Sequence, residues 1–403
     1  MQPLTSGVRA GLSASKILDL LQSQSAIRID YGAAGLDENF NPLVDLTPYM
    51  TEGSTITSDG FATVHRTCNL MIDSNASNVW NYLSGFIQPY MTFTDRLTGF
   101  TAQFNLGVYT LTTPSLALGT SPSIATFAGY DLIYLLQQVI GDSYEIKSGV
   151  DPAAAAAATI EAAIPGVKVD YTPSDSTLAK TMTFPMDASS PPTYLSVISA
   201  LLNSIGYRPV WVDWEGTFRI ESFTDPQDMS PEWIFDLSDR MNIVAEDRAQ
   251  DLDLFDVPNW FRFVMDNLTG PAVEGTTMLT YQDNSAINPG SIQNRGRLIK
   301  HIEQVTVSTF LDLQTYAKKT IQRLLNPSEI FSVTTQPLPL AWHMDVFDYN
   351  DTNLANISPS YSSHRSILAT GWTMPLDGRS DMQWTWQTIT DQTLDDLLLT
   401  VVV

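Results

Sequence analysis

The sequence predicts an α+β protein that is mainly β, with two β-rich domains on either side of an inserted α+β domain. Alternating apolar and polar residues, typical of half-buried strands, fill the first part of the chain and return after residue 225. Between these parts, apolar residues recur at helical spacing. At 403 residues, the chain also exceeds the size at which one hydrophobic core keeps growing. We therefore predict domains at residues 1–126, 127–224 and 225–403.

The first domain is predicted to consist of strands with two short helices. Serine-capped apolar residues predict a helix over 13–23, and a second helix is expected over 77–87, closed by Pro89. Alternating strand patterns flank two turn signals, Asp59-Gly60 and Gly99.

The inserted domain is predicted to contain three helices and a hairpin. The segment 130–141 is strongly apolar and ends at Gly141, which favours a helix with a glycine stop. Asp151-Pro152 opens an alanine-rich run that predicts a surface helix rather than a linker. A wide apolar stripe over 194–205 predicts a further helix, and Glu215-Gly216 supplies the turn of a hairpin.

The second β-rich domain is predicted to hold one helix near 309–325, stopped by Asn326-Pro327. Strand patterns precede it at 259–267 and 298–307. The apolar tail 395–403 is expected to form a last strand or to contact a partner.

The charge balance excludes a general nucleic-acid binder. The chain carries 44 Asp and Glu against 21 Lys and Arg, a net charge of −23, and would repel phosphate. A single cysteine, Cys68, excludes an intrachain disulfide and a multi-cysteine metal site. No apolar run has the length of a signal peptide or a membrane span, so we expect a soluble protein made in the cytoplasm.

The candidate catalytic and metal-binding residues favour no enzyme. His343 and Asp345 have strand spacing without a third ligand nearby, which favours a strand pair over a metal site. His65 and Cys68 are three residues apart in a predicted strand and are expected on opposite faces, which argues against a catalytic dyad. Hydrolase, zinc-protease and phosphate-loop motifs are missing from the sequence. We expect no cofactor and no metal.

Two alternatives remain open at this stage. Asp213 and Glu215, predicted on one strand face beside tryptophans, would suit a carbohydrate-active hydrolase, although two-residue spacing places them too close together to flank a glycosidic bond easily. Trp384 and Trp386 would suit a receptor- or glycan-binding module. A packed hairpin turn and a strand with one aromatic face are the structural interpretations of the same residues.

A basic cluster at 295–301 stands out in this acidic chain. If the segment is extended, Arg295 and Arg297 share one face and Lys300 points the other way. Apart from the adjacent helix, no further basic segment supports a nucleic-acid site. We therefore predict that Arg295, Arg297 and Lys300 form a salt-bridged interface with an acidic neighbour.

The order of segments resembles the baseplate hub or tail-tip hub proteins of tailed bacteriophages, often called minor tail proteins in phages of actinobacteria. The similar segments are GSTITSDGFATVHRTCNLMI, NLGVYTLTTPS, ATFAGYDLIYLLQQVIG, TYLSVISALLNSIGYRPVWVDWEGTFRIES, SIQNRGRLIKHIEQVTVSTFLDLQTYAKKTIQRLL and LPLAWHMDVFDYND. They follow the family's order over most of the chain.

This resemblance implies a structural virion protein. Two related β-barrel-like tube domains in each chain of a homotrimer would make a pseudo-hexameric ring, which continues a six-fold tail tube into a three-fold tip. The implied partners are a distal tail ring protein, a tape-measure protein and downstream tip or receptor-binding proteins. The protein would be assembled in the host cytoplasm and reside at the tail tip. Part of the acidic surplus would line a DNA channel.

Overall fold

The computed structural model describes residues 27–73, 85–96, 99, 101–112, 115–116, 124–187, 189–236, 250–251, 257–265, 278–286, 290–305, 307, 310–325, 330–340, 342, 344–350, 364–377, 380–389 and 400–401. The helix predicted over 13–23, most of that over 77–87, the predicted stop at Asn326-Pro327 and His343 lie outside these residues.

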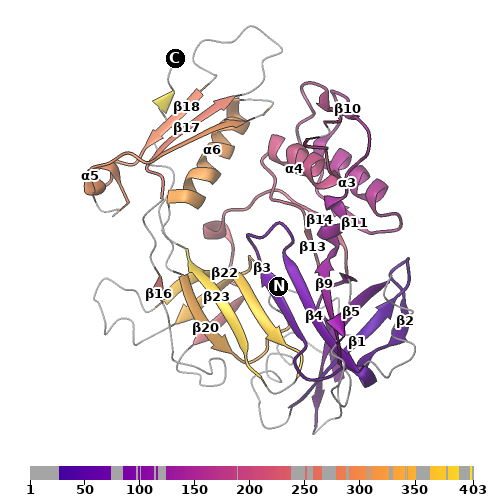
Figure 1. Cartoon of the computed structure of the whole chain (residues 1–403). Coiled ribbons are helices and arrows are strands. Elements are labelled where there is room, and N and C mark those ends of the chain that lie inside the picture. Colours follow the sequence, from indigo (N-terminus) through magenta and orange to yellow (C-terminus); the bar gives the residue numbers. More distant parts are fainter. Residues whose placement is uncertain are drawn as a thin grey trace.

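One large sheet of 15 strands joins the two β-rich parts of the chain (Figure 1). The first part contributes β1 (Ile27–Leu36), β2 (Pro42–Asp45), β3 (Thr55–Asp59), β4 (Arg66–Asp73), β5 (Phe86–Asp95), β6 (Thr101–Asn105), β7 (Tyr109–Leu111), β8 (Ser115–Leu116) and β9 (Ile124–Asp131), with a short 3-10 helix, η1 (Thr47–Tyr49). The second part contributes β15 (Trp233–Asp236), β16 (Gln250–Asp251), β20 (Ile330–Thr335), β21 (Val346–Asn350), β22 (His364–Pro375) and β23 (Met382–Thr388).

The two parts meet where β3 pairs antiparallel with β22, so that Asp59 lies opposite Gly371 and Thr57 opposite Thr373. This pairing makes both β-rich parts one hydrogen-bonded sheet. The domain boundary predicted at residue 126 falls within β9, which continues to Asp131 and pairs with β4 over its whole length.

The predicted strands and turns of the first part are confirmed, but the helix over 77–87 is wrong at its C-terminal end. β5 begins at Phe86 and contains Pro89. Pro89 lies between the segment of β5 that pairs with β7 and the segment that pairs with β6. Proline has no backbone N–H to donate. At this position between the two pairings, its presence interrupts neither the ladder with β6 nor the ladder with β7.

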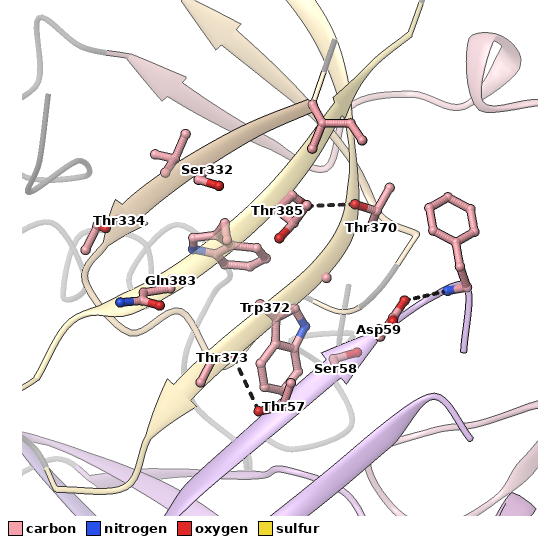
Figure 2. A pocket seen from close by; sticks show the side chains of 15 residues that line it. Thr57, Ser58, Asp59, Ser332, Thr334, Thr370, Trp372, Thr373, Gln383 and Thr385 are labelled. Carbon is pink, nitrogen blue, oxygen red and sulfur yellow. Dashed lines mark hydrogen bonds between the residues drawn. The ribbon is translucent and has the colours of Figure 1, made fainter. Parts of the chain in front are cut away.

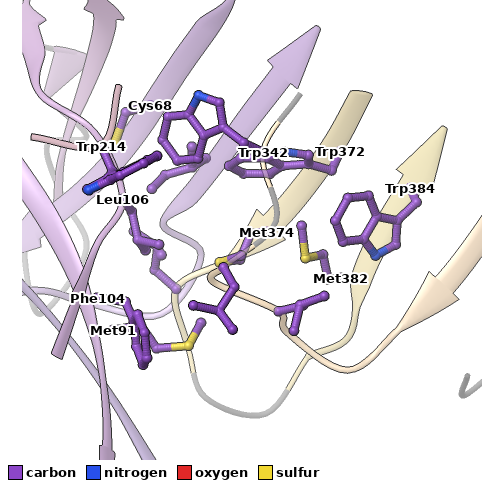
Figure 3. Close-up of a cluster of buried hydrophobic side chains, with 14 of the residues drawn as sticks. Cys68, Met91, Phe104, Leu106, Trp214, Trp342, Trp372, Met374, Met382 and Trp384 are labelled. Carbon is purple, nitrogen blue, oxygen red and sulfur yellow. The ribbon is translucent and has the colours of Figure 1, made fainter. Parts of the chain in front are cut away.

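The main hydrophobic core lies between strands of the two β-rich parts (Figure 3). It is rich in tryptophan: the Trp214 and Trp342 rings meet edge to face at 5.8 Å between centroids, and Trp342 lies 6.3 Å from Trp372. Because one core serves both parts, we expect them to fold and unfold together.

The insertion forms its own α+β layer with a separate core (Figure 1). Its elements are a 3-10 helix η3 (Leu132–Gln137), β10 (Tyr144–Ile146), α3 (Pro152–Ala163), β11 (Val169–Tyr171), β12 (Met182–Phe184), α4 (Tyr194–Ser204), β13 (Trp211–Val212) and β14 (Phe218–Ile220). Two predicted helices and the hairpin are confirmed. The helix expected over 130–141 is only η3, because Val139 forms a bridge with Thr193 and the chain turns extended at Gln138.

A smaller unit in the second part holds the predicted helix near 309–325 (Figure 1). Its elements are β17 (Trp260–Met265), β18 (Met278–Gln282), α5 (Ile292–Arg295), β19 (Lys300–Val305), α6 (Phe310–Leu325) and β24 (Thr400–Val401); a 3-10 turn, η4 (Pro226–Asp228), lies further upstream. The sheet order is β19-β17-β18-β24, so the predicted last strand is confirmed at Thr400–Val401. Helix α6 covers one face of this sheet.

Candidate functional site

The face of the large sheet that points away from the main core is almost uncharged across six adjacent strands. These strands follow the order β20-β23-β22-β3-β4-β9, and every second residue of each points away from the core. One row crosses all six strands in register; it consists of Thr334, Gln383, Thr373, Thr57, Thr67 and Tyr130. We call this the neutral row. The hydroxyls of Thr57 and Thr373 lie 3.3 Å apart, across the junction between the two β-rich parts.

A groove of about 560 Å³ lies over part of this face (Figure 2). Its polar lining is mostly hydroxyls with one amide, among them those of Thr57, Ser332, Thr334, Thr373, Gln383 and Thr385. Among the residues that line it, Asp59 carries the one charge. Such a surface forms hydrogen bonds with water but offers no cation to hold a phosphate.

Trp384 and Trp386 do not contribute to an exposed aromatic surface. Their exposed fractions are 2% and 1%, because they point into the core on the opposite face of β23. The indole N–H of Trp384 donates to the hydroxyl of Thr335 at 2.7 Å. The structural interpretation of an aromatic strand face is confirmed, and the glycan-platform alternative on these two residues is wrong.

Asp213 and Glu215 lie in the turn after β13 rather than on a strand face, so that part of the prediction is also wrong. Asp213 is buried, and its Oδ1 accepts the backbone N–H groups of Glu215 and Thr217, both at 2.9 Å. Glu215 instead accepts the side-chain amide of Asn105 at 3.0 Å. The two carboxylates thus hold a turn and tie it to β6.

The second oxygen of Asp213 completes this structural role. It accepts Nε and Nη2 of Arg219 at 3.0 and 2.8 Å. A carboxylate with four hydrogen bonds to its own hairpin has no free lone pair directed at a substrate.

Arg66 is a fully buried charge that lies at the junction of the insertion with both β-rich parts. Its Nη2 donates to the carbonyl of Val212 at 2.7 Å, and its guanidinium lies 4.2 Å from the centroid of Trp342. Its Nε is 3.9 Å from Oδ2 of Asp131, whose carboxylate also accepts the N–H of Ile133 at the start of η3. Sequence reasoning missed this residue, because a lone arginine in an alternating strand gives no signal of burial.

The titratable groups around Arg66 respond to burial. Desolvation raises the pKa of the Asp131 carboxyl to about 6, against the opposing charge of Arg66. Burial, followed by the charge of Arg66, lowers the pKa of the His65 imidazole to about 4. Burial also raises the pKa of the Cys68 thiol, which therefore remains protonated and packs as a small apolar side chain in the main core.

The described part of the chain contains no group of three or more His, Cys, Asp and Glu residues able to hold a metal. Asp345, half of the predicted pair with His343, is buried and accepts the N–H of Trp342 at 2.6 Å. Burial raises the pKa of its carboxyl to about 6. Asp345 thus shapes the turn before β21.

The basic cluster is not extended, so the predicted sharing of one strand face by Arg295 and Arg297 is wrong. Arg295 is the last residue of α5, and Gly296 follows in the left-handed region with φ 65°. The guanidinium of Arg295 donates to the carbonyl of Val257 at 3.0 Å. A serine cap at Ser291 and the glycine five residues later were the sequence signals of this short helix.

Arg297 and Lys300 are exposed, and Lys300 begins β19. That the cluster contacts an acidic neighbour stays a prediction. Among the described residues, no helix is long and apolar enough to cross a membrane.

Comparison with known proteins identifies the fold. No family model matches the chain, and no curated protein matches its sequence. A tail protein from Neisseria meningitidis MC58 is similar in structure, with a TM-score of 0.60, 13% identity, and coverage of 89% of this chain and 96% of that one. The 43 kDa tail protein of prophage MuSo2 from Shewanella oneidensis gives a TM-score of 0.55, 12% identity, and coverage of 89% and 98%.

A Francisella PdpA-VgrG complex is a further structural neighbour, with a TM-score of 0.54 and 9% identity over 97% of this chain and 58% of that one. The chain therefore has the fold of phage tail proteins, shared also by a chain of a VgrG complex. The mainly β, α+β fold class predicted from the sequence is confirmed.

Proposed function

We propose that this protein is a structural component of a phage-type tail, the hub of the tail tip or baseplate, and that it assembles as a homotrimeric ring. The observation that carries this proposal is the single sheet that joins two β-rich parts through β3 and β22, in a fold shared with phage tail proteins. If each part acts as one tube unit, three chains supply six units. Such a ring adapts a six-fold tube to a three-fold tip.

The neutral row supports a channel wall in this ring, with a chemistry that differs from the acidic wall expected from composition. Hydroxyl and amide groups carry no charge, so they gain none of the counterion-release free energy by which cations would hold DNA in place. A wall of this kind lets a polyanion pass without adhesion. In this proposal the acidic surplus lies elsewhere on the surface and DNA passes during ejection.

The proposed partners follow from that position. They are a distal tail ring protein, a tape-measure protein and downstream tip or receptor-binding proteins, in a virion assembled in the host cytoplasm. We propose no catalytic activity. Asp213, Glu215 and Asp345 form hydrogen bonds that hold turns in place, and His65 is buried.

Electron microscopy of the purified protein, together with its mass in solution, tests the proposal. We expect a particle three times the mass of the 44.5 kDa chain, with a ring-shaped projection and a central opening. The neutral row should line that opening in a reconstruction. A monomer without a ring at micromolar concentration, or a protein that cleaves glycan, would contradict the proposal.

A further inference from the structure

The sheet of the smaller unit presents one basic and apolar face. Phe261 and Phe263 of β17 pack toward α6, so the residues between and before them point to the other side. There, Trp260 lies under two cations: the Arg262 guanidinium is 4.7 Å and the Lys300 ammonium 5.5 Å from its ring centroid.

Exposed apolar side chains surround these cations. Ile302, two residues after Lys300 on the same face of β19, is 62% exposed, and Leu298 just before the strand is 53% exposed. We call Trp260, Arg262, Leu298, Lys300 and Ile302 the basic face. Two exposed aliphatic residues next to two cations form a surface that can bury apolar area and pair with carboxylates at the same time.

A complementary surface lies at the end of the large sheet. β2 is the last strand of the sheet path, and its pairing with β1 shifts register between Val44 and Pro42. Leu43 is the extra residue of this bulge and is 61% exposed. Glu38 and Asp45, both exposed, lie on either side of it in sequence. We call Glu38, Leu43, Asp45 and Tyr49, which is 37% exposed, the acidic edge.

The two surfaces lie at opposite ends of the molecule. In Figure 1, β2 is at the lower right, whereas β17, β18 and α6 are at the upper left. They are therefore too far apart to meet within one chain. Opposite charge and matching exposed apolar residues on distant patches of one molecule suit a head-to-tail contact between copies, which closes into a ring when the rotation allows.

We propose that the basic face of one copy docks on the acidic edge of the next copy. Lys300 and Arg262 meet the carboxylates of Glu38 and Asp45, and Ile302 and Leu298 pack against Leu43. This contact rests on the proposed ring, since it specifies the surfaces through which the copies of that ring meet.

A charge exchange tests the contact in the full-length protein. Lys300→Glu and Glu38→Lys should each raise the dissociation constant of the assembly by on the order of threefold to tenfold at low salt, because each places like charges together. The chain that carries both substitutions should regain assembly close to that of the unmodified protein. Mass photometry over a dilution series reports these constants at 20 and 300 mM salt, where the Debye length is about 20 Å and about 6 Å.

Lys147→Glu is the matched control, because it makes the same charge change at an exposed lysine of the insertion and should leave assembly unchanged. Leu43→Ser tests the apolar half and should weaken assembly at both salt concentrations. If the unmodified protein assembles but Lys300→Glu and Glu38→Lys assemble equally well, the contact is wrong and the ring remains. If the unmodified protein is monomeric, the ring itself is overturned.

Discussion

At the scale of single residues, Arg66 explains how three parts of the chain are held in one arrangement. It belongs to β4, bonds the carbonyl of Val212 in the insertion, and stacks on Trp342 from the second part. Gly107 makes room for it, since a Cβ there would lie 2.3 Å from Nη1 of Arg66. A charge in this position needs its partner Asp131, because an isolated buried ion is costly.

Arg66→Met should therefore destabilise the protein by about 3–5 kcal/mol, since it leaves the Asp131 carboxylate buried without its counter-charge. Methionine fills much of the arginine stem, so the loss reflects charge and hydrogen bonding more than volume. Urea denaturation followed by tryptophan fluorescence measures the effect, because Trp342 lies directly against the guanidinium.

The double variant Arg66→Met with Asp131→Asn is the control for this interpretation. The asparagine keeps an acceptor for the N–H of Ile133 and removes the uncompensated charge. Its loss of stability should be smaller than the sum of the two single losses. Additive losses would show that Arg66 acts through packing alone.

At the scale of elements, the sequence around α3 specifies where the helix begins but not which of its residues are buried. Asp151 caps the helix by accepting the N–H of Ala153 at 2.9 Å, and it also accepts the N–H of Ser174 at 3.3 Å. The alanines are not a simple surface run: Ala153, Ala156 and Ala157 are buried against the core of the insertion. Small side chains there allow α3 to approach α4 closely.

Asp151→Ala should cost about 1–2 kcal/mol in the stability of the insertion, because it removes the cap and a second N–H loses its acceptor. Amide hydrogen exchange of residues 152–163 measures this locally, and protection should fall there before it falls in the large sheet. Asp151→Asn, which retains a capping oxygen, should lose much less. Equal protection in the alanine variant would mean that packing, not the cap, fixes the start of the helix.

Elements with local signals could be predicted, and those decided by distant contacts could not. The caps and glycine stops of α3, α4 and the β13–β14 hairpin lie within a few residues of the elements they define. The helix expected over 130–141 failed because Val139 pairs with Thr193, which is remote in sequence. Pro89 suggested a helix end because nothing local reveals that β5 changes partners there.

The candidate sites follow the same division. Exposure of the Arg297 and Lys300 cluster could be read from charge in the sequence, and Gly296 signalled the turn before them, but the companion cation Arg262 could not be predicted. The neutral row was missed altogether. It exists only once six strands from both ends of the chain are set in register.

At the scale of the whole molecule, the pairing of β3 with β22 is what makes one body of two β-rich parts. It brings together residues 316 positions apart, such as Thr57 and Thr373. On one face of this junction lies the shared tryptophan core, and on the other lies the neutral row. If the neutral row lines a channel as proposed, this junction must stay closed, because an opening there would expose unpaired backbone groups to any passing polymer.

Gly371 is the residue on which this junction depends most directly. It follows a register shift in β22, and a Cβ at this position would lie 2.8 Å from the carbonyl oxygen of Ser58. That neighbour is backbone, so the two strands must separate to admit any side chain. Gly371→Val should therefore destabilise the protein by about 1–3 kcal/mol. It should also split a single calorimetric transition into two, as the β-rich parts lose their common sheet.

Thr373→Ala is the matched control on the same strand: it removes only the hydroxyl contact with Thr57 and should lower stability by about 1 kcal/mol with one transition retained. A valine variant that unfolds as the unmodified protein does would show that the shared core alone, without the β3–β22 pairing, couples the two parts.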